Sequence, residues 1–231
     1  NLNEINYCLL EAYKRSKMKE KIMEVFNSFK KPLDYYNYSE TVKALLEAEG
    51  FEESLKLLEE AKRFCTMDYI DKKYEKLSQE RRKRYFNRWN FEVEFLRGRA
   101  LKGQKNYEEA LKSFERAKGF LKPSFQGTYM DNFNLHLAQL LKEMGKKEEA
   151  ISTIIPDVLF EKNEENYKFF KEIYKEIYNS EEGIEEFLMK KKEEISPFAM
   201  DFTLKSYEGK EFNFKEISKG KVALLTFWFP T

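Results

Sequence analysis

The chain has 231 residues, of which 42 are basic and 41 acidic, so its formal net charge is +1. That balance gives no overall attraction to nucleic acid or to an anionic membrane, and it argues against nucleic acid as a partner. The 21 Phe and 14 Tyr against 9 Gly and 5 Pro indicate a helix-rich chain with enough aromatic surface to fill a core. No stretch is typical of a membrane-spanning helix or of a secretion signal. Because the first residue is Asn1, we expect the native N-terminus to have been removed.

Apolar side chains at helical spacing predict a series of antiparallel helical hairpins along most of the chain. The predicted hairpins are 4–30, 39–65, 91–123, 133–155, and 164–178 paired with 181–195. The stretch 66–95 also has helical spacing, and we expect it to lengthen the hairpins beside it. Ser180 stands before two glutamates and is expected to be the N-cap of the last helix.

One short pattern recurs in three of these hairpins. It consists of an aromatic residue or Lys, two Glu, a small residue and an apolar residue, and the small residue is Ser54, Ala110 or Ala150. The clearest unit, 91–123, also has small residues in its first helix, which let two helices approach closely. This unit resembles a tetratricopeptide (TPR) repeat through Gly98, Leu101, Tyr107, Ala110, Phe114, Ala117 and Pro123. It lacks the usual tryptophan of the family. The small residues of the three patterns, Ser54, Ala110 and Ala150, are 56 and 40 residues apart, and both spacings exceed the family's period of about 34.

The resemblance implies a mainly α fold over 1–195, a TPR-like solenoid of antiparallel helical hairpins. It also implies a protein or peptide partner bound on a concave face that is lined by the first helix of each hairpin. In the clearest repeat the implied partner contacts are Glu92, Phe95, Arg99 and Lys102. The alternative is that these are ordinary solvated helix residues.

The pattern changes at residue 196, where Ser-Pro ends the helical region. Alternation of period two at 201–204 and at 212–214, around a turn at 207–210, predicts a β-hairpin. The apolar run 222–229 predicts a strand buried on both faces. Such a strand needs neighbours, so we expect its folding unit to continue after the last residue. Its open edges also favour cover by the helices or by a second copy, which would give a homodimer.

The C-terminal stretch 196–231 resembles the first part of thioredoxin-fold proteins, namely the TlpA/ResA-like thiol–disulfide oxidoreductases and the related peroxiredoxins. The residues that carry this resemblance are Asp201-Phe202-Thr203-Leu204, Gly209-Lys210, Gly220-Lys221 and Leu224-Leu225-Thr226-Phe227-Trp228. The TlpA-like pattern implies a redox cysteine directly after Thr231, and the peroxiredoxin pattern implies one a few residues later. A sharper hypothesis is a UGA codon after Thr231 that encodes selenocysteine.

The resemblance implies that the intact protein is a thiol–disulfide oxidoreductase, and that residues 1–231 alone lack its catalytic residue. It also implies a location outside the cytoplasm, because TlpA-like proteins usually work there. Two alternatives stay open. One is a protein-binding scaffold without redox function, whose β segment packs against the helices, and the other is a peroxiredoxin-like antioxidant protein.

No catalytic residue, metal site or cofactor is predicted within the chain. Cys8 and Cys65 lie far apart without CxxC spacing, so they are interpreted as buried small hydrophobic residues, the alternative being a disulfide in a secreted chain. His136 is the single histidine and has no partner residues for zinc or for general-base chemistry, so a structural role is predicted. The basic run at 81–84 is interpreted as a solvated helix face, with an anion or nucleic-acid contact as the alternative.

Overall fold

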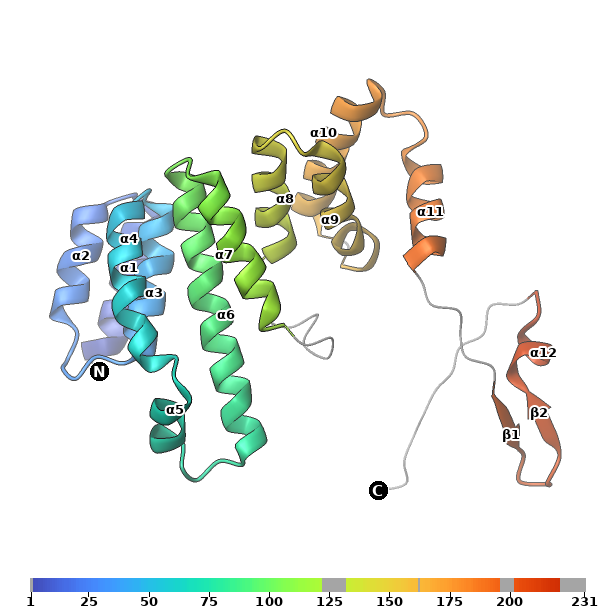
Figure 1. Cartoon of the computed structure of the whole chain (residues 1–231), viewed down its shortest axis with the longest axis horizontal. Helices are drawn as coiled ribbons and strands as arrows, with labels where there is room; N and C mark the ends of the chain where they lie inside the picture. The colour runs from blue at the N-terminus through green and yellow to red at the C-terminus, as the bar shows by residue number, and fades with distance from the viewer. Residues whose placement is uncertain (1, 122–131, 162, 196–201, 221–231) are drawn as a thin grey trace. The chain divides into compact units, whose positions relative to one another are not determined.

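The computed structural model describes residues 2–121, 132–161, 163–195 and 202–220, which are mainly helical (Figure 1). The chain divides into two compact units, 1–184 and the residues from 185 onward. The first unit contains α1 (Leu2–Arg15), α2 (Lys19–Ser28), α3 (Tyr35–Glu47), α4 (Phe51–Ala61), the 3-10 helix η1 (Lys62–Phe64), α5 (Met67–Lys73), α6 (Gln79–Gly103), α7 (Tyr107–Gly119), α8 (Phe133–Glu143), α9 (Lys147–Phe160) and α10 (Glu164–Tyr178). The division falls at the start of α11 (Ile184–Ile195), earlier than the change of pattern at residue 196.

One turn geometry joins four pairs of helices in the described part of the first unit: α1 with α2, α3 with α4, α6 with α7, and α8 with α9. In each turn one residue is left-handed, with φ between 53° and 79°: Lys17, Glu49, Lys105 and Gly145. The N–H of the next residue bonds to the carbonyl five residues earlier: Met18 to Tyr13, Gly50 to Leu45, Asn106 to Leu101, and Lys146 to Leu141, at 2.8–3.0 Å. This is the Schellman arrangement, which satisfies the last carbonyls of the first helix and reverses the chain within three residues.

The second helix of each pair begins directly after this turn, and its fourth residue is fully buried. In three of the pairs that fourth residue is the small residue of the recurring pattern, namely Ser54, Ala110 or Ala150. In the first pair it is Ile22, which explains why the pattern is unrecognisable there. The predicted positions of these hairpins are confirmed.

The approach of α6 to α7 depends on a glycine. A methyl group at Gly98 would lie 3.0 Å from ring carbons of Phe114, which is itself fully buried. The ring of Phe95 lies on the same side of α6, with its centroid 5.9 Å from that of Phe114. The glycine therefore makes room for an aromatic ring between the two helices, as the sequence predicts.

The helix α6 is much longer than its partner α7, with 25 residues against 13, and α5 lies beside its first half (Figure 1). Trp89 is fully buried there, stacked on Tyr35 at 4.4 Å between ring centroids. Further tyrosines surround the indole: Tyr36, Tyr69, Tyr74 and Tyr85. The predicted extension of the hairpins by residues 66–95 is thus confirmed, and an aromatic cluster holds it against α3.

The segment between α10 and α11 corrects one prediction. The helix α11 begins at Ile184, so Ser180 is not its N-cap. Its hydroxyl oxygen accepts a hydrogen bond from the N–H of Glu182 at 3.0 Å, and the hydroxyl of Tyr174 donates to the carbonyl of Glu182 at 3.1 Å. The serine therefore stabilises a turn, and a second turn with Gly183 at φ 80° precedes the helix.

The second unit contains an antiparallel hairpin of β1 (Thr203–Lys205) and β2 (Glu211–Asn213), followed by the short α12 (Phe214–Ser218). Leu204 pairs with Phe212 in the register of the two strands. The rings of Phe202 and Phe214 stack at 4.8 Å and close its open end. The predicted β-hairpin is confirmed. The predicted strand at 222–229, and the homodimer contact proposed for it, lie outside the described residues. No helix within the described ranges is long and apolar enough to cross a membrane.

We expect Gly98→Leu to lower the free energy of unfolding by about 3 kcal/mol, because the added side chain must displace the buried ring of Phe114. Urea unfolding followed by circular dichroism measures the effect. Gly119→Leu is the matched control, since a methyl group at Gly119 would have no atom within 4 Å. Equal stability of the two variants would contradict this account of the α6–α7 contact.

We expect Asp157→Asn to stabilise the chain at neutral pH. Asp157 in α9 is 7% exposed, and the Asn134 amide donates to it at 2.6 Å. Burial raises the pKa of the Asp157 carboxyl from 3.8 to about 6. The free energy of unfolding therefore falls as the pH rises from about 4 to about 6. It stays lower above that range, because the buried Asp157 carboxyl is then ionised.

Replacing this carboxyl by an amide should add about 1–2 kcal/mol near pH 7.5 and almost nothing near pH 4. Urea unfolding at both pH values measures the difference. Asp68→Asn, at an exposed position in α5, serves as the control and should bring no gain. A gain for Asp157→Asn that is the same at both pH values would contradict the raised pKa.

Candidate functional site

The four residues predicted to contact a partner lie along the second half of α6, and the structure places them in two groups. Glu92 and Arg99 face α3, where they contact Lys43 and Glu47. Phe95 and Lys102 face α8, where they contact Phe133 and Gln139 among others. Within each group the two residues are seven apart, which is two turns of helix and hence one face. Each group therefore links α6 to one neighbouring helix.

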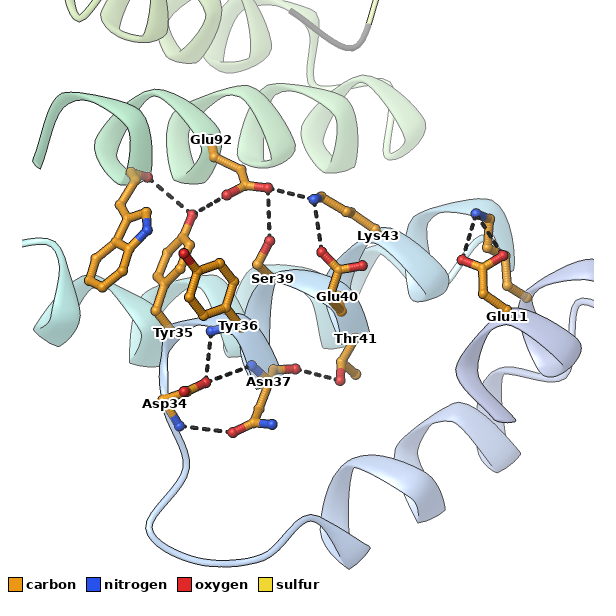
Figure 2. Close-up of polar contacts among 12 residues, drawn as sticks. Glu11, Asp34, Tyr35, Tyr36, Asn37, Ser39, Glu40, Thr41, Lys43 and Glu92 are labelled. Atoms are coloured by element: carbon orange, nitrogen blue, oxygen red, sulfur yellow. Dashed lines mark hydrogen bonds and ion pairs between the residues drawn. The ribbon is translucent and has the colours of Figure 1, made fainter. Parts of the chain in front are cut away.

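Glu92 is the centre of a buried polar network (Figure 2). Its carboxylate accepts hydrogen bonds from the Tyr35 hydroxyl at 2.7 Å and from the Ser39 hydroxyl at 2.9 Å. The Lys43 ammonium lies 2.6 Å from the same carboxylate and 3.0 Å from Glu40. Burial by itself would raise the pKa of Glu92, but the charge of Lys43 and the three hydrogen bonds outweigh it and lower that pKa. The carboxylate is therefore ionised and fully partnered.

The start of α3 positions the donors of this network. The Asp34 carboxylate accepts hydrogen bonds from the N–H groups of Tyr36 and Asn37, and the Asn37 side chain accepts one from the N–H of Asp34 (Figure 2). This capping box fixes the first turn of the helix. The three donors Tyr35, Ser39 and Lys43 are then four residues apart, so they lie on one face and reach the same carboxylate.

Two cations of α6, one from each group, lie near the single histidine. Arg99 forms an ion pair with Glu47 at 2.8 Å, and Lys102 donates to Gln139 at 2.8 Å. The ring of His136 packs on Phe95, with centroids 5.6 Å apart. Burial and the positive charges of Arg99 and Lys102 lower the pKa of His136 to about 3. Its imidazole is therefore neutral at physiological pH, and its contacts are those of a structural residue.

All four predicted residues are engaged in contacts within the chain. Phe95 is 2% exposed. The side chains of Glu92, Arg99 and Lys102 are 16%, 18% and 17% exposed. That they contact a partner stays a prediction.

The two cysteines do not form a disulfide. Cys65 is buried as predicted, whereas Cys8 is exposed, so the interpretation of both as buried residues is wrong for Cys8. Burial and the nearby charge of Glu92 raise the pKa of the Cys65 thiol to about 12. A thiol with such a pKa has almost no thiolate at neutral pH, so Cys65 is a poor nucleophile.

Sequence reasoning missed a groove at the other end of α6. It has a volume of about 400 Å³ and is formed by Leu77, the first half of α6, and Phe120 and Leu121, which directly follow α7. Three arginines of α6 line it, Arg81, Arg84 and Arg88. The interpretation of the basic run as a solvated face agrees with the exposure of Arg81, Lys83 and Arg84. Arg81 and Arg84 line the groove, Arg82 forms an ion pair with Asp71 at 3.1 Å, and Lys83 is exposed. The spacing of three and four residues between Arg81, Arg84 and Arg88 was the signal available in the sequence. That spacing gave no sign that Phe120 and Leu121, directly after α7, complete the groove.

No group of His, Cys, Asp and Glu side chains within the described residues is arranged to hold a metal ion. Comparisons with known protein families and with curated proteins found no match to this chain.

We expect Glu92→Gln to lower the free energy of unfolding by about 2–3 kcal/mol near pH 7, because it removes the charge that pairs with the partly buried Lys43. Since the pKa of Glu92 is lowered by folding, its contribution is complete above about pH 4.5 and is lost as the pH falls through the lowered value. The difference between the two proteins should therefore shrink in acid.

Chemical unfolding across the range from about pH 3 to about pH 7 measures this difference. Glu52→Gln is the control, because Glu52 forms an exposed ion pair with Lys56 within one helix. That variant should unfold like the unmodified protein. A Glu92→Gln effect that does not depend on pH would contradict an ionised carboxylate in this network.

Proposed function

We propose that residues 1–195 form a TPR-like protein-interaction module and that residues 196–231 begin a thiol–disulfide oxidoreductase domain of thioredoxin-like fold. The observation that carries the first half is the hairpin turn that recurs four times, each followed by a second helix whose fourth residue is buried. Hairpins that repeat one geometry and bury their faces on each other are the units from which α-solenoids are built.

The contacts between successive hairpins support this proposal. Glu92 links α6 to α3 of the preceding hairpin, and Lys102 links it to α8 of the following one. An array joined in this way presents a rigid surface, and rigid surfaces bind partners at a smaller cost in conformational entropy. We propose that Arg99 and Lys102, whose side chains are 18% and 17% exposed, contact the partner, while Glu92 and Phe95 hold α6 in place.

The β-hairpin of the second unit supports the oxidoreductase half. Its strands and turn coincide with the segments Phe202-Thr203-Leu204 and Gly209-Lys210 of the resemblance. The remaining matched segments, from Lys221 onward, lie outside the described residues. The buried Cys65 does not supply a reactive thiol, because its pKa is raised to about 12. The proposal therefore places the redox cysteine or selenocysteine after Thr231, and it carries with it an extracytoplasmic location.

Sequencing the gene beyond the codon for Thr231 and expressing the extended product tests the oxidoreductase half. We expect a cysteine or UGA codon within the next few positions. With cysteine there, the extended protein should catalyse reduction of insulin disulfides by dithiothreitol, because a helix N-terminus lowers the thiol pKa. The same protein with serine at that position is the control. Equal activity of the two extended proteins, or a gene without such a codon, would contradict the proposal.

A further inference from the structure

The groove between α6 and α7 has a strongly cationic wall. Arg81, Arg84 and Arg88 project from one face of α6 over about 10 Å along its axis. Arg84 also forms an ion pair with Glu80 in the same helix, but both side chains are more than half exposed, so a ligand can exchange for it at little cost. No carboxylate is among the described residues that line the groove. The wall therefore carries three guanidinium groups, and the described residues that line the groove add no negative charge.

The remainder of the groove is mainly aromatic and aliphatic, with Asn87 as a further polar lining residue. Tyr85 is stacked on Tyr74 at 4.4 Å, and Phe120 at the end of α7 packs edge-on against Phe86 at 6.2 Å. Phe91 is buried at the base. These ring contacts are made within the chain and need no ligand. The rings offer an apolar surface that a ligand with charged groups alone would not contact.

The groove lies on the face of α6 that packs on α8 farther along. Arg81 and Arg88 are seven residues apart, and Phe95 and Lys102 continue the same series toward α8. Two of the three arginines of the groove, Arg81 and Arg88, are therefore in line with the two residues that join the hairpins. A segment bound there would lie beside the end of α7 and next to the α6–α8 contact.

We propose that this groove binds an acidic segment of a partner protein, with carboxylates on the arginines and an apolar side chain against the rings. The proposal rests on the interaction module proposed above and names the chemistry of its partner. Charge complementarity is the argument, because the planar guanidinium group pairs with a carboxylate through two parallel hydrogen bonds. The apolar floor selects a ligand that carries a hydrophobic side chain among its negative charges.

The same observations disfavour nucleic acid as the ligand. The cationic wall is short, and neighbouring basic side chains are neutralised within the chain, as in the pairs Arg82 with Asp71 and Arg116 with Glu94. The net charge of +1 supplies no wider field. A single-stranded nucleic acid needs a longer basic track with stacking positions along it.

Fluorescence anisotropy with the 231-residue chain tests the proposal. The probe is a fluorescein-labelled peptide of sequence Glu-Glu-Phe-Glu-Glu-Leu-Glu-Glu, and its counterpart has every Glu replaced by Gln. We expect the acidic peptide to bind at least about 10-fold more tightly than the Gln peptide. Its binding should weaken between about 50 and about 200 mM NaCl, because exposed charges are screened over that range.

The double variant R81Q/R88Q should weaken binding of the acidic peptide by about 10-fold or more. The control is K83Q/K112Q, which removes the same amount of charge at one residue of α6 and one of α7, both outside the groove. We expect the control to bind within about twofold of the unmodified chain. Circular dichroism of both variants shows whether they are folded, and the conservative R81K/R88K repeats the test with charge retained, where a loss of intermediate size is expected.

Four results would overturn the proposal: no binding of the acidic peptide up to about 1 mM, equal binding of the Gln peptide, equal losses in the two glutamine variants, or tighter binding of an oligothymidylate of about twelve nucleotides. These outcomes are separate from the redox test. If the acidic peptide does not bind but the extended protein is redox-active, the groove proposal is wrong and the oxidoreductase proposal is unaffected. If the peptide binds but the extended protein has no redox activity, only the interaction module is supported.

Discussion

The position of α6 depends on one buried carboxylate. An ionised glutamate inside a protein is costly unless opposite charge and hydrogen bonds replace the lost water. Glu92 meets that requirement with three donors that all come from α3, namely Tyr35, Ser39 and Lys43. A helix held in this way has little freedom to rotate. The rotation of α6 then decides which residues meet α8 and which line the groove, so the site and the stacking of hairpins follow from the same contact.

Local backbone chemistry supplies the units that this contact assembles. The recurring turn satisfies the end of one helix and starts the next within three residues, and it tolerates three different residues at the left-handed position, Lys, Glu and Gly. A unit of this kind is tolerant of sequence, because only the buried position four residues into the second helix and the turn itself are constrained. That tolerance accounts for hairpins as different as α1–α2 and α6–α7. It also accounts for the long α6, whose added turns pack on α5 and the Trp89 cluster.

Particular residues show how far pattern reading reaches. Helical spacing predicted the hairpins, and period-two alternation predicted β1 and β2, because both depend on neighbours in sequence. The same reading took Glu92 for a solvated residue or a partner contact, since a charged residue in a charged helix gives no sign of burial. Its donors lie about fifty residues earlier. Ser180 had the sequence of an N-cap, yet the helix begins at Ile184, after a turn in which the Tyr174 hydroxyl donates to the carbonyl of Glu182.

The amino-acid sequence by itself determined which stretches become helices, where the hairpins turn and where the β-hairpin lies, because caps, turns and periodicity act over a few residues. It also placed three arginines on one face of α6. Only the tertiary structure decided that Glu92 is buried, that the pKa of Cys65 is raised to about 12 and that the arginines line a groove. Burial, electrostatic environment and cavity shape arise between helices that are distant in sequence, and local patterns carry no information about those distances.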